Sequence, residues 1–204
     1  MVFAKIVKKE RSDLCHVHRS DKMKKENSSH LLERLEVQAE SEIKLAIGVF
    51  QNLSADVMLQ PSSKVGWSIA QCLEHLNSYG RFYLPHIKSA LEKHKHSKPK
   101  VFFTSGWLGN YFTNMMSPNS GKHYKAFKNH IPTTTLDPAS VVAEFIAQQE
   151  LLLTYLEEAK KINIGEVKIP VSIAPWVKLK LGDVFQFLMA HNERHIAQAK
   201  RNLP

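Results

Sequence analysis

Residues 181–195, LGDVFQFLMAHNERH, join an apolar helical stripe to a pair of histidines. The apolar residues recur every three or four positions, which is the pattern of a helix with one buried face. His191 follows Val184 by seven residues and His195 follows Leu188 by seven, so both imidazoles point where the buried side chains point. Histidines four positions apart lie one turn from each other, so both can reach a single metal ion.

Similar periodicity elsewhere predicts four helices in all. The second helix has the clearest start, because Ser68 and Gln71 match a capping box. Pro85 within that helix predicts a kink or a local break. Asp137-Pro138 is a typical start for the third helix, with Asp as the N-cap. We expect the helices at about 29–53, 69–94, 138–156 and 181–202.

Two connectors separate these helices. Residues 95–135 are too aromatic to be disordered throughout, so we expect part of them to lie over the bundle, with a short helix near 107–116. In the connector at residues 162–179, the alternation of Val167, Ile169, Val171 and Ile173 would suit a short strand, but an isolated strand is marginal, so we predict an extended loop there. The fold class is all-α: a four-helix bundle whose long connector lets the second and third helices run parallel.

Composition and charge exclude several functional classes. The chain has 204 residues and a formal charge of +9, with an excess of lysine and arginine in residues 1–27 and 88–130. We expect residues 1–27 to be a basic, loosely ordered extension and residues 28–204 to be the domain. The basic residues follow no helix face and accompany no RNA-binding or zinc-finger signature, so we do not expect a nucleic-acid-binding protein. The absence of a membrane helix or a secretory signal, together with only two cysteines, predicts a cytoplasmic protein.

A third metal ligand should come from another helix. His75 is the best candidate, because it lies at the flank of the apolar stripe of the second helix. Three histidines with one position left open are typical of catalytic rather than structural zinc. Glu193 is two residues after His191, whereas a metalloprotease carries its glutamate directly after the first histidine, so we expect Glu193 to face solvent or a neighbouring chain. The alternative is that some of the histidines are ordinary core or surface residues.

Two stretches together resemble the DinB-like (YfiT-like) family. They are WSIAQCLEHL at residues 67–76 and the segment from Leu181-Gly182-Asp183 through His191, His195 and Gln198. The resemblance implies a four-helix bundle of unusual connectivity, commonly dimeric, with Zn or Ni on His75, His191 and His195. Characterised relatives include transferases that join a low-molecular-weight thiol (bacillithiol, mycothiol or glutathione) to an electrophile.

The function we expect is therefore a thiol-dependent S-transfer, with a metal-bound thiol or water as the nucleophile and no side chain assigned to catalysis. Arg81 and Arg194 would pair with carboxylates of the thiol, and the aromatic connector would cover an apolar electrophile. Alternatives are a metal-dependent hydrolase and a non-catalytic, metal-stabilised module for stress-related binding or dimerisation. DNA binding through the basic extension is a further reading, and it predicts salt-sensitive retention on DNA.

Overall fold

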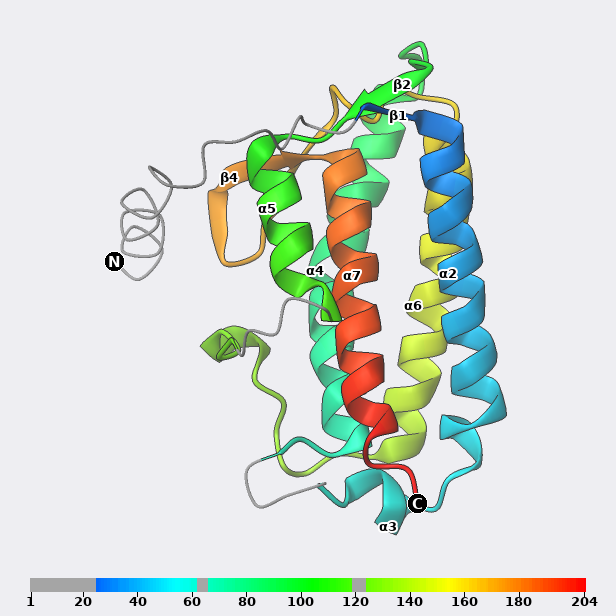
Figure 1. Cartoon of the computed structure of the whole chain (residues 1–204), viewed down its shortest axis with the longest axis vertical. Coiled ribbons are helices and arrows are strands. Elements are labelled where there is room, and N and C mark those ends of the chain that lie inside the picture. Colours follow the sequence, from blue (N-terminus) through cyan, green and yellow to red (C-terminus); the bar gives the residue numbers. More distant parts are fainter. Residues whose placement is uncertain (1–24, 62–65, 119–123) are drawn as a thin grey trace.

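Four long helices make up the bundle in the computed structural model, which describes residues 25–61, 66–118 and 124–204 (Figure 1). This confirms the expected fold class. The bundle helices are α2 (Ser28–Gly48), α4 (Ile69–His94), α6 (Pro138–Ala159) and α7 (Leu181–Lys200). Within the described ranges, no helix is both long enough and apolar enough to cross a bilayer.

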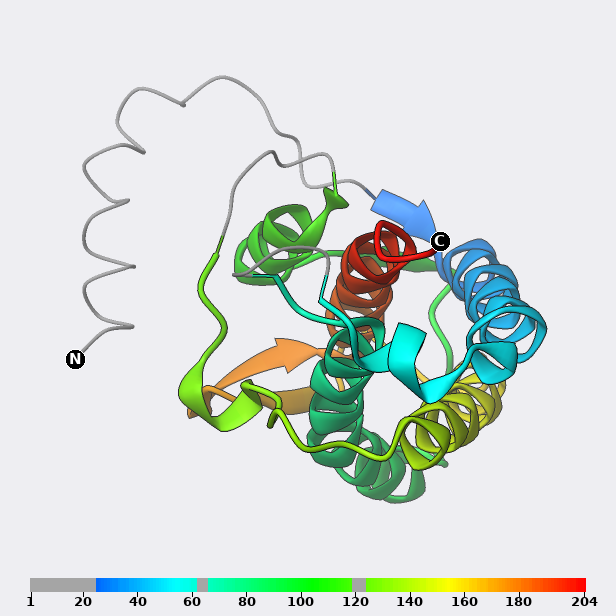
Figure 2. The same cartoon turned by 90° about the horizontal axis from the view of Figure 1, so that it is seen from below.

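The connectivity places α4 and α6 parallel. Figures 1 and 2 show α2 and α7 running in one direction and α4 and α6 in the other. Helix α4 packs against α6 and α7, while α2 packs mainly against α6. The parallel pair follows from the long connector, as expected.

The start of α4 is held by the predicted capping box. The Ser68 hydroxyl accepts a hydrogen bond of 3.2 Å from the amide of Gln71, and the Gln71 side chain accepts one of 3.0 Å from the amide of Ser68. These bonds satisfy two of the amides that a helix start leaves without partners. Helix α4 continues through Pro85 to His94, so the local break that we considered does not occur.

The long connector contains β2 (Phe102–Thr104), the expected short helix α5 (Trp107–Met116) and the 3-10 turn η3 (Lys128–His130). Asp183 of α7 holds the start of α5, because its carboxylate accepts bonds of 2.6 Å from the Ser105 hydroxyl and 3.0 Å from the Gly106 amide. Gly109 of α5 then packs so closely on Asp183 that a β-carbon there would lie 2.2 Å from the Asp183 Cγ atom.

Three predictions about the ends and the type of secondary-structure elements need correction. The first helix ends at Gly48, and η1 (Phe50–Asn52) and α3 (Ala55–Leu59) follow it. The end of the expected extension forms β1 (Lys25–Asn27), which pairs antiparallel with β2, while residues 1–24 of that extension lie outside the described residues. The expected loop contains an antiparallel hairpin, β3 (Lys168–Val171) and β4 (Ala174–Lys180).

The hairpin forms because it is not isolated. Ile169, Val171 and Leu179 are buried in the same apolar cluster as Tyr83 of α4 and Leu181 of α7. Burial against the bundle therefore supplies the stabilisation that two strands alone lack.

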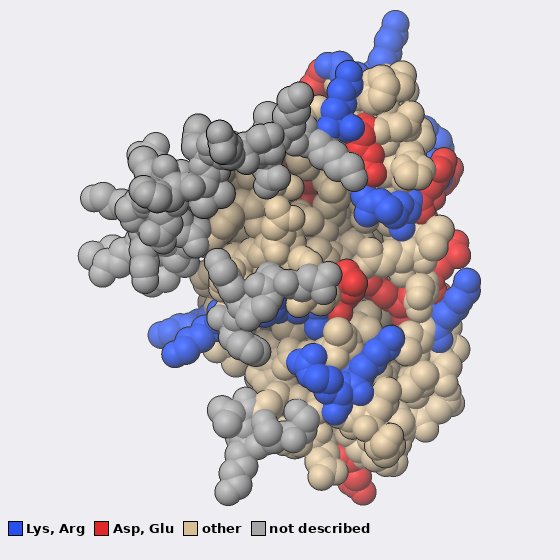
Figure 3. Space-filling model, in the orientation of Figure 1, with Lys and Arg blue, Asp and Glu red and all other residues tan. Residues whose placement is uncertain are grey.

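One polar layer crosses the bundle between two apolar clusters. Along α7 the layer falls between Met189 in the first cluster and Ile196 in the second. Its buried polar residues are Glu42 of α2, His75 of α4, Gln149 of α6, and His191 and Asn192 of α7. On the face seen in Figure 3, lysine and arginine side chains lie at separate places with acidic side chains between them.

Candidate metal centre

Three histidines from two helices meet within this layer. His75 of α4 and His191 and His195 of α7 each offer one ligand atom, and these atoms all lie within 4.8 Å of one another. The Nε2 atoms of His75 and His191 are 3.1 Å apart. Two nitrogens bound to one tetrahedral zinc at about 2.0–2.1 Å are separated by roughly 3.3–3.4 Å. The spacing therefore fits a shared divalent metal.

All three imidazoles are held in the neutral form that binds metals. Burial lowers the pKa of His75 to about 4. Burial and the neighbouring His75 lower the pKa of His195 to about 3. Burial, followed by the charges of His195 and His75, lowers the pKa of His191 well below its usual range. Each ring therefore has a lone pair at neutral pH.

Hydrogen bonds select the ring nitrogen that faces the centre. The Nδ1–H of His75 donates to the carbonyl oxygen of His130 at 2.6 Å, and the Nδ1–H of His195 donates to Gln198 Oε1 at 3.0 Å. Both arrangements leave Nε2 as the lone-pair atom, as in most metal-binding histidines. The Nδ1 atom of His191 is buried without a hydrogen-bond partner among the described residues.

Aromatic rings wall the centre. Trp67 lies with its ring centroid 4.8 Å from that of His75 and 5.7 Å from that of His195. Tyr79 meets His191 at 4.4 Å, and Phe187 stacks on His191 at 5.7 Å. These rings lower the exposure of the imidazoles to solvent, which strengthens electrostatic interactions there, although His195 remains partly exposed.

His130 is a contributor that sequence reasoning missed. Its ring lies between the Ser78 hydroxyl at 2.9 Å and the Ser172 hydroxyl at 3.2 Å, while its carbonyl accepts the proton of His75. Burial lowers the pKa of His130 to about 4, so this ring is also neutral. The contact of His130 with His75 is made by a backbone carbonyl, which every residue has, so a sequence pattern cannot predict it. The one available signal was the presence of a histidine within the connector.

The two arginines proposed for thiol binding have different surroundings. Arg81 donates to Glu144 of α6 and to Glu74, so its charge is already paired between α4 and α6. These contacts give no support to a role in thiol binding. Arg194 lies on α7 beside the histidines, and its charge contributes to the lowered pKa of both His191 and His195. Its guanidinium also reaches the carbonyl of Met115 in α5 at 3.5 Å.

The structure also shows the surroundings of two further residues near the histidines, Glu193 and Cys72. Glu193 is exposed on α7, as expected for a residue on the far side of the helix from the histidines. Cys72 is fully buried in an apolar cluster, and burial raises the pKa of its thiol to about 12. Cys72 therefore packs in the core, and its sulfur is not grouped with the three histidines.

The fold and the site define a class of protein: a four-helix bundle with three histidines that converge from two of its helices. The chain belongs to the DinB superfamily, whose family model matches residues 38–199. Among solved structures the chain is similar to YfiT from Bacillus subtilis, described as a probable metal-dependent hydrolase with an unusual four-helix bundle topology. That match covers 90% of each chain at 15% identity with a TM-score of 0.49. A search of curated proteins found no match.

Proposed function

We propose that the protein is a divalent-metal-dependent S-transferase, in which His75, His191 and His195 hold Zn²⁺ or Ni²⁺. The observation that carries the proposal is the convergence of three neutral imidazoles, with no fourth His, Cys, Asp or Glu grouped with them among the described residues. A metal with three histidine ligands keeps a position for a reactant. When bound, it would act as a Lewis acid and lower the pKa of a low-molecular-weight thiol, which is the nucleophile.

Arg194 supports a thiol cofactor. It is a permanent cation that acts electrostatically on two of the histidines and lies at the junction of α7 and α5. A guanidinium in this place would attract the carboxylate of a thiol such as glutathione or bacillithiol. Replacing Arg194 by methionine should therefore raise the KM for the thiol more than it lowers kcat.

A hydrolase is the second candidate, because the same open position could hold water. Lewis acidity would then activate water instead of a thiol, with the same three histidines as ligands. The two candidates differ in one requirement: the transferase needs a thiol for turnover, and the hydrolase does not.

The deciding experiment combines metal analysis with turnover. Protein purified without added metal is analysed for its elements and titrated with Zn²⁺ or Ni²⁺, with Trp67 as a fluorescent reporter beside His75 and His195. The protein is then given 1-chloro-2,4-dinitrobenzene with glutathione, bacillithiol or mycothiol, and 4-nitrophenyl acetate without a thiol. We expect thiol-dependent conversion that is lost in His191→Ala and retained in His86→Ala, an exposed histidine of α4.

Each other outcome has a distinct meaning. Ester cleavage without a thiol, lost in His191→Ala, would replace the transferase by the hydrolase. Metal binding with no turnover, and with only a lower Tm in His191→Ala, would support a metal-stabilised binding module. We further propose that the protein acts as a homodimer, which light scattering after size-exclusion chromatography tests.

A further inference from the structure

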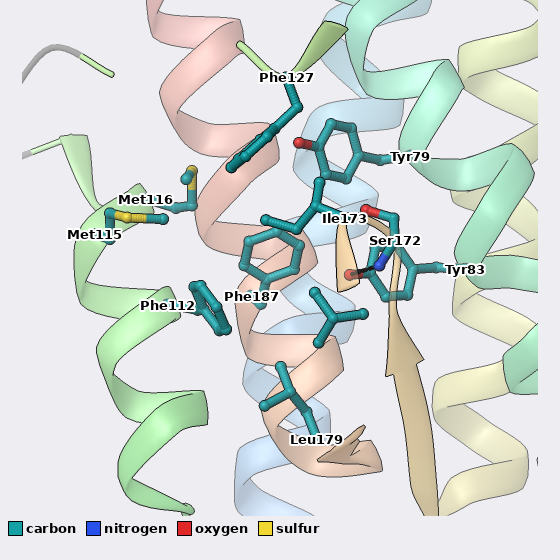
Figure 4. Close-up of a pocket in the computed structure, with 11 residues that line it drawn as sticks. Tyr79, Tyr83, Phe112, Met115, Met116, Phe127, Ser172, Ile173, Leu179 and Phe187 are labelled. Carbon is teal, nitrogen blue, oxygen red and sulfur yellow. Dashed lines mark hydrogen bonds between the residues drawn. The ribbon is translucent and has the colours of Figure 1, made fainter. Parts of the chain in front are cut away.

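An apolar pocket lies beside the histidines, where α4, α5, α7 and the turn between β3 and β4 meet (Figure 4). The empty space between its walls, counted together with the open solvent at its mouth, is about 330 Å³. Phe112 and Met116 of α5, Ile173 of the hairpin turn and Leu179 of β4 are among its walls. None of the lining residues that the structure describes carries a charge.

Two rings belong both to this pocket and to the wall of the metal centre. Phe187 lines the pocket and stacks on His191 with ring centroids 5.7 Å apart. Tyr79 lines the pocket and meets His191 at 4.4 Å, and its hydroxyl points toward the pocket, on the side of Phe127 (Figure 4). A group in the pocket would therefore contact two rings that themselves contact His191.

The lining has few polar groups, and two of its three polar side chains are already hydrogen-bonded to the protein. Three lining side chains are polar: Tyr79, Tyr83 and Ser172. The Tyr83 hydroxyl accepts a bond of 3.2 Å from the Ser172 amide, and the Ser172 hydroxyl pairs with His130 Nε2 at 3.2 Å. Within the described residues, the Tyr79 hydroxyl makes no hydrogen bond. A charged ligand would lose its hydration here without gaining an ionic partner from the lining, which is strongly unfavourable.

We propose that this pocket binds the uncharged, apolar part of the substrate, an aromatic or branched aliphatic group with one acceptor oxygen bound by the Tyr79 hydroxyl. The acceptor is a carbonyl or an ether oxygen, and it lies at the end of the pocket nearest the histidines. The inference rests on the proposed function only in calling the ligand a substrate, because binding to the pocket needs no turnover.

Three small probes test the pocket by ligand-observed NMR titration, with the protein as purified and after treatment with a chelator. Acetophenone is neutral and has one acceptor, ethylbenzene has no acceptor, and benzoate has a similar size and a charge. We expect acetophenone to bind most tightly and benzoate at least about tenfold more weakly than acetophenone, because a carboxylate finds no cation among the described lining residues.

Two pairs of variants locate the binding. Ile173→Trp fills the pocket and should abolish binding of acetophenone and ethylbenzene, whereas Ile131→Trp, at an exposed position, should not. Tyr79→Phe should weaken acetophenone about tenfold, as expected for one lost hydrogen bond, and leave ethylbenzene unchanged. Tyr155→Phe, a buried tyrosine of α6 outside the pocket, is the matched control.

Equal or tighter binding of benzoate, or unchanged binding in Ile173→Trp, would overturn the proposal. Unchanged acetophenone affinity in Tyr79→Phe would overturn the role of the hydroxyl. The proposed transferase fails separately: acetophenone binding that responds to these variants, in a protein without thiol-dependent turnover, would keep the pocket and remove the transferase.

Discussion

The carbonyl oxygen of His130 lies 2.6 Å from Nδ1 of His75 and accepts its proton, so a turn of the connector orients a residue of α4. Because the His130 ring is held by Ser78 and Ser172, we expect His130→Ala to loosen this carbonyl. Removing the support of a ligand weakens metal binding by about 10- to 100-fold. Competition with a chromophoric chelator measures the change. A lower Tm with unchanged zinc affinity would show that His130 only packs.

Metal removal should destabilise the protein. A ligand present at about 1,000 times its Kd stabilises the folded state by about 4 kcal/mol. We therefore expect a chelator to lower the Tm of the wild-type protein and of His86→Ala, and to leave the Tm of His75→Ala and His191→Ala unchanged. Differential scanning calorimetry with and without Zn²⁺ checks this. A zinc-dependent Tm that persists in His191→Ala would remove that residue from the ligand set.

Two glycines should respond to alanine in opposite ways. At Gly109 the new β-carbon would lie 2.2 Å from Asp183 Cγ, so α5 must move away from α7. Overpacking of this kind destabilises by about 1–3 kcal/mol. Gly48, at the end of α2, has nothing within 4 Å of the same position, so Gly48→Ala should be neutral or stabilising by up to about 1 kcal/mol. Urea denaturation compares the two variants, and a stable Gly109→Ala would show that α5 tolerates displacement.

Glu42 should make stability fall as the pH rises above neutrality. Burial raises its pKa to about 8, while Gln38 and Asn192 donate hydrogen bonds to its carboxyl group. The unfolded chain loses this proton at about pH 4.5, so the folded state binds more protons between those pH values and becomes less stable as the pH rises. The buried histidines act in the opposite direction, because their pKa values are lowered in the folded state, so the contribution of Glu42 is measured as the difference between the wild-type protein and Glu42→Gln.

Relative to Glu42→Gln, we expect the free energy of unfolding of the chelator-treated wild-type protein to fall by about 1 kcal/mol between pH 7 and 8.5. Urea titrations of Glu42→Gln should lack this fall. Glu40→Gln, on the exposed side of α2, should retain it. A profile that is the same in all three proteins would mean that Glu42 is ionised in the folded state.

Periodicity and local chemistry were enough to predict the bundle and the three grouped histidines. His191 and His195 continue the stripe of Val184 and Leu188, and a regular helix carries that direction forward without knowledge of the rest of the fold. The capping box at Ser68 is equally local. The sequence also predicts that His75 lies on the second helix near its apolar stripe. Its distance from His191 and His195, however, depends on the packing of α4 against α7, which the sequence pattern does not give.

The errors come from contacts between distant segments. The hairpin of β3 and β4 depends on burial of Ile169 and Leu179 against the bundle, which alternation alone does not reveal. The pairing of β1 with β2 joins residues more than seventy positions apart in the chain, such as Lys25 and Thr104. The first helix was extended past Gly48 because its apolar spacing continues to Leu53, although a glycine is a common sign of a helix end.

The three grouped histidines stand on α4 and α7, while much of the pocket wall comes from α5 and the β3–β4 hairpin, two inserts between the bundle helices. Because the histidines and the pocket walls lie on different segments, the choice of pocket ligand can change in evolution independently of the histidines. Substitutions in residues 107–116 and 168–180, or replacement of these segments by those of related proteins, would change the walls of the pocket. The positions of the three imidazoles would stay the same. Chimaeras built at these two inserts therefore test whether the pocket can be changed without disturbing the three histidines.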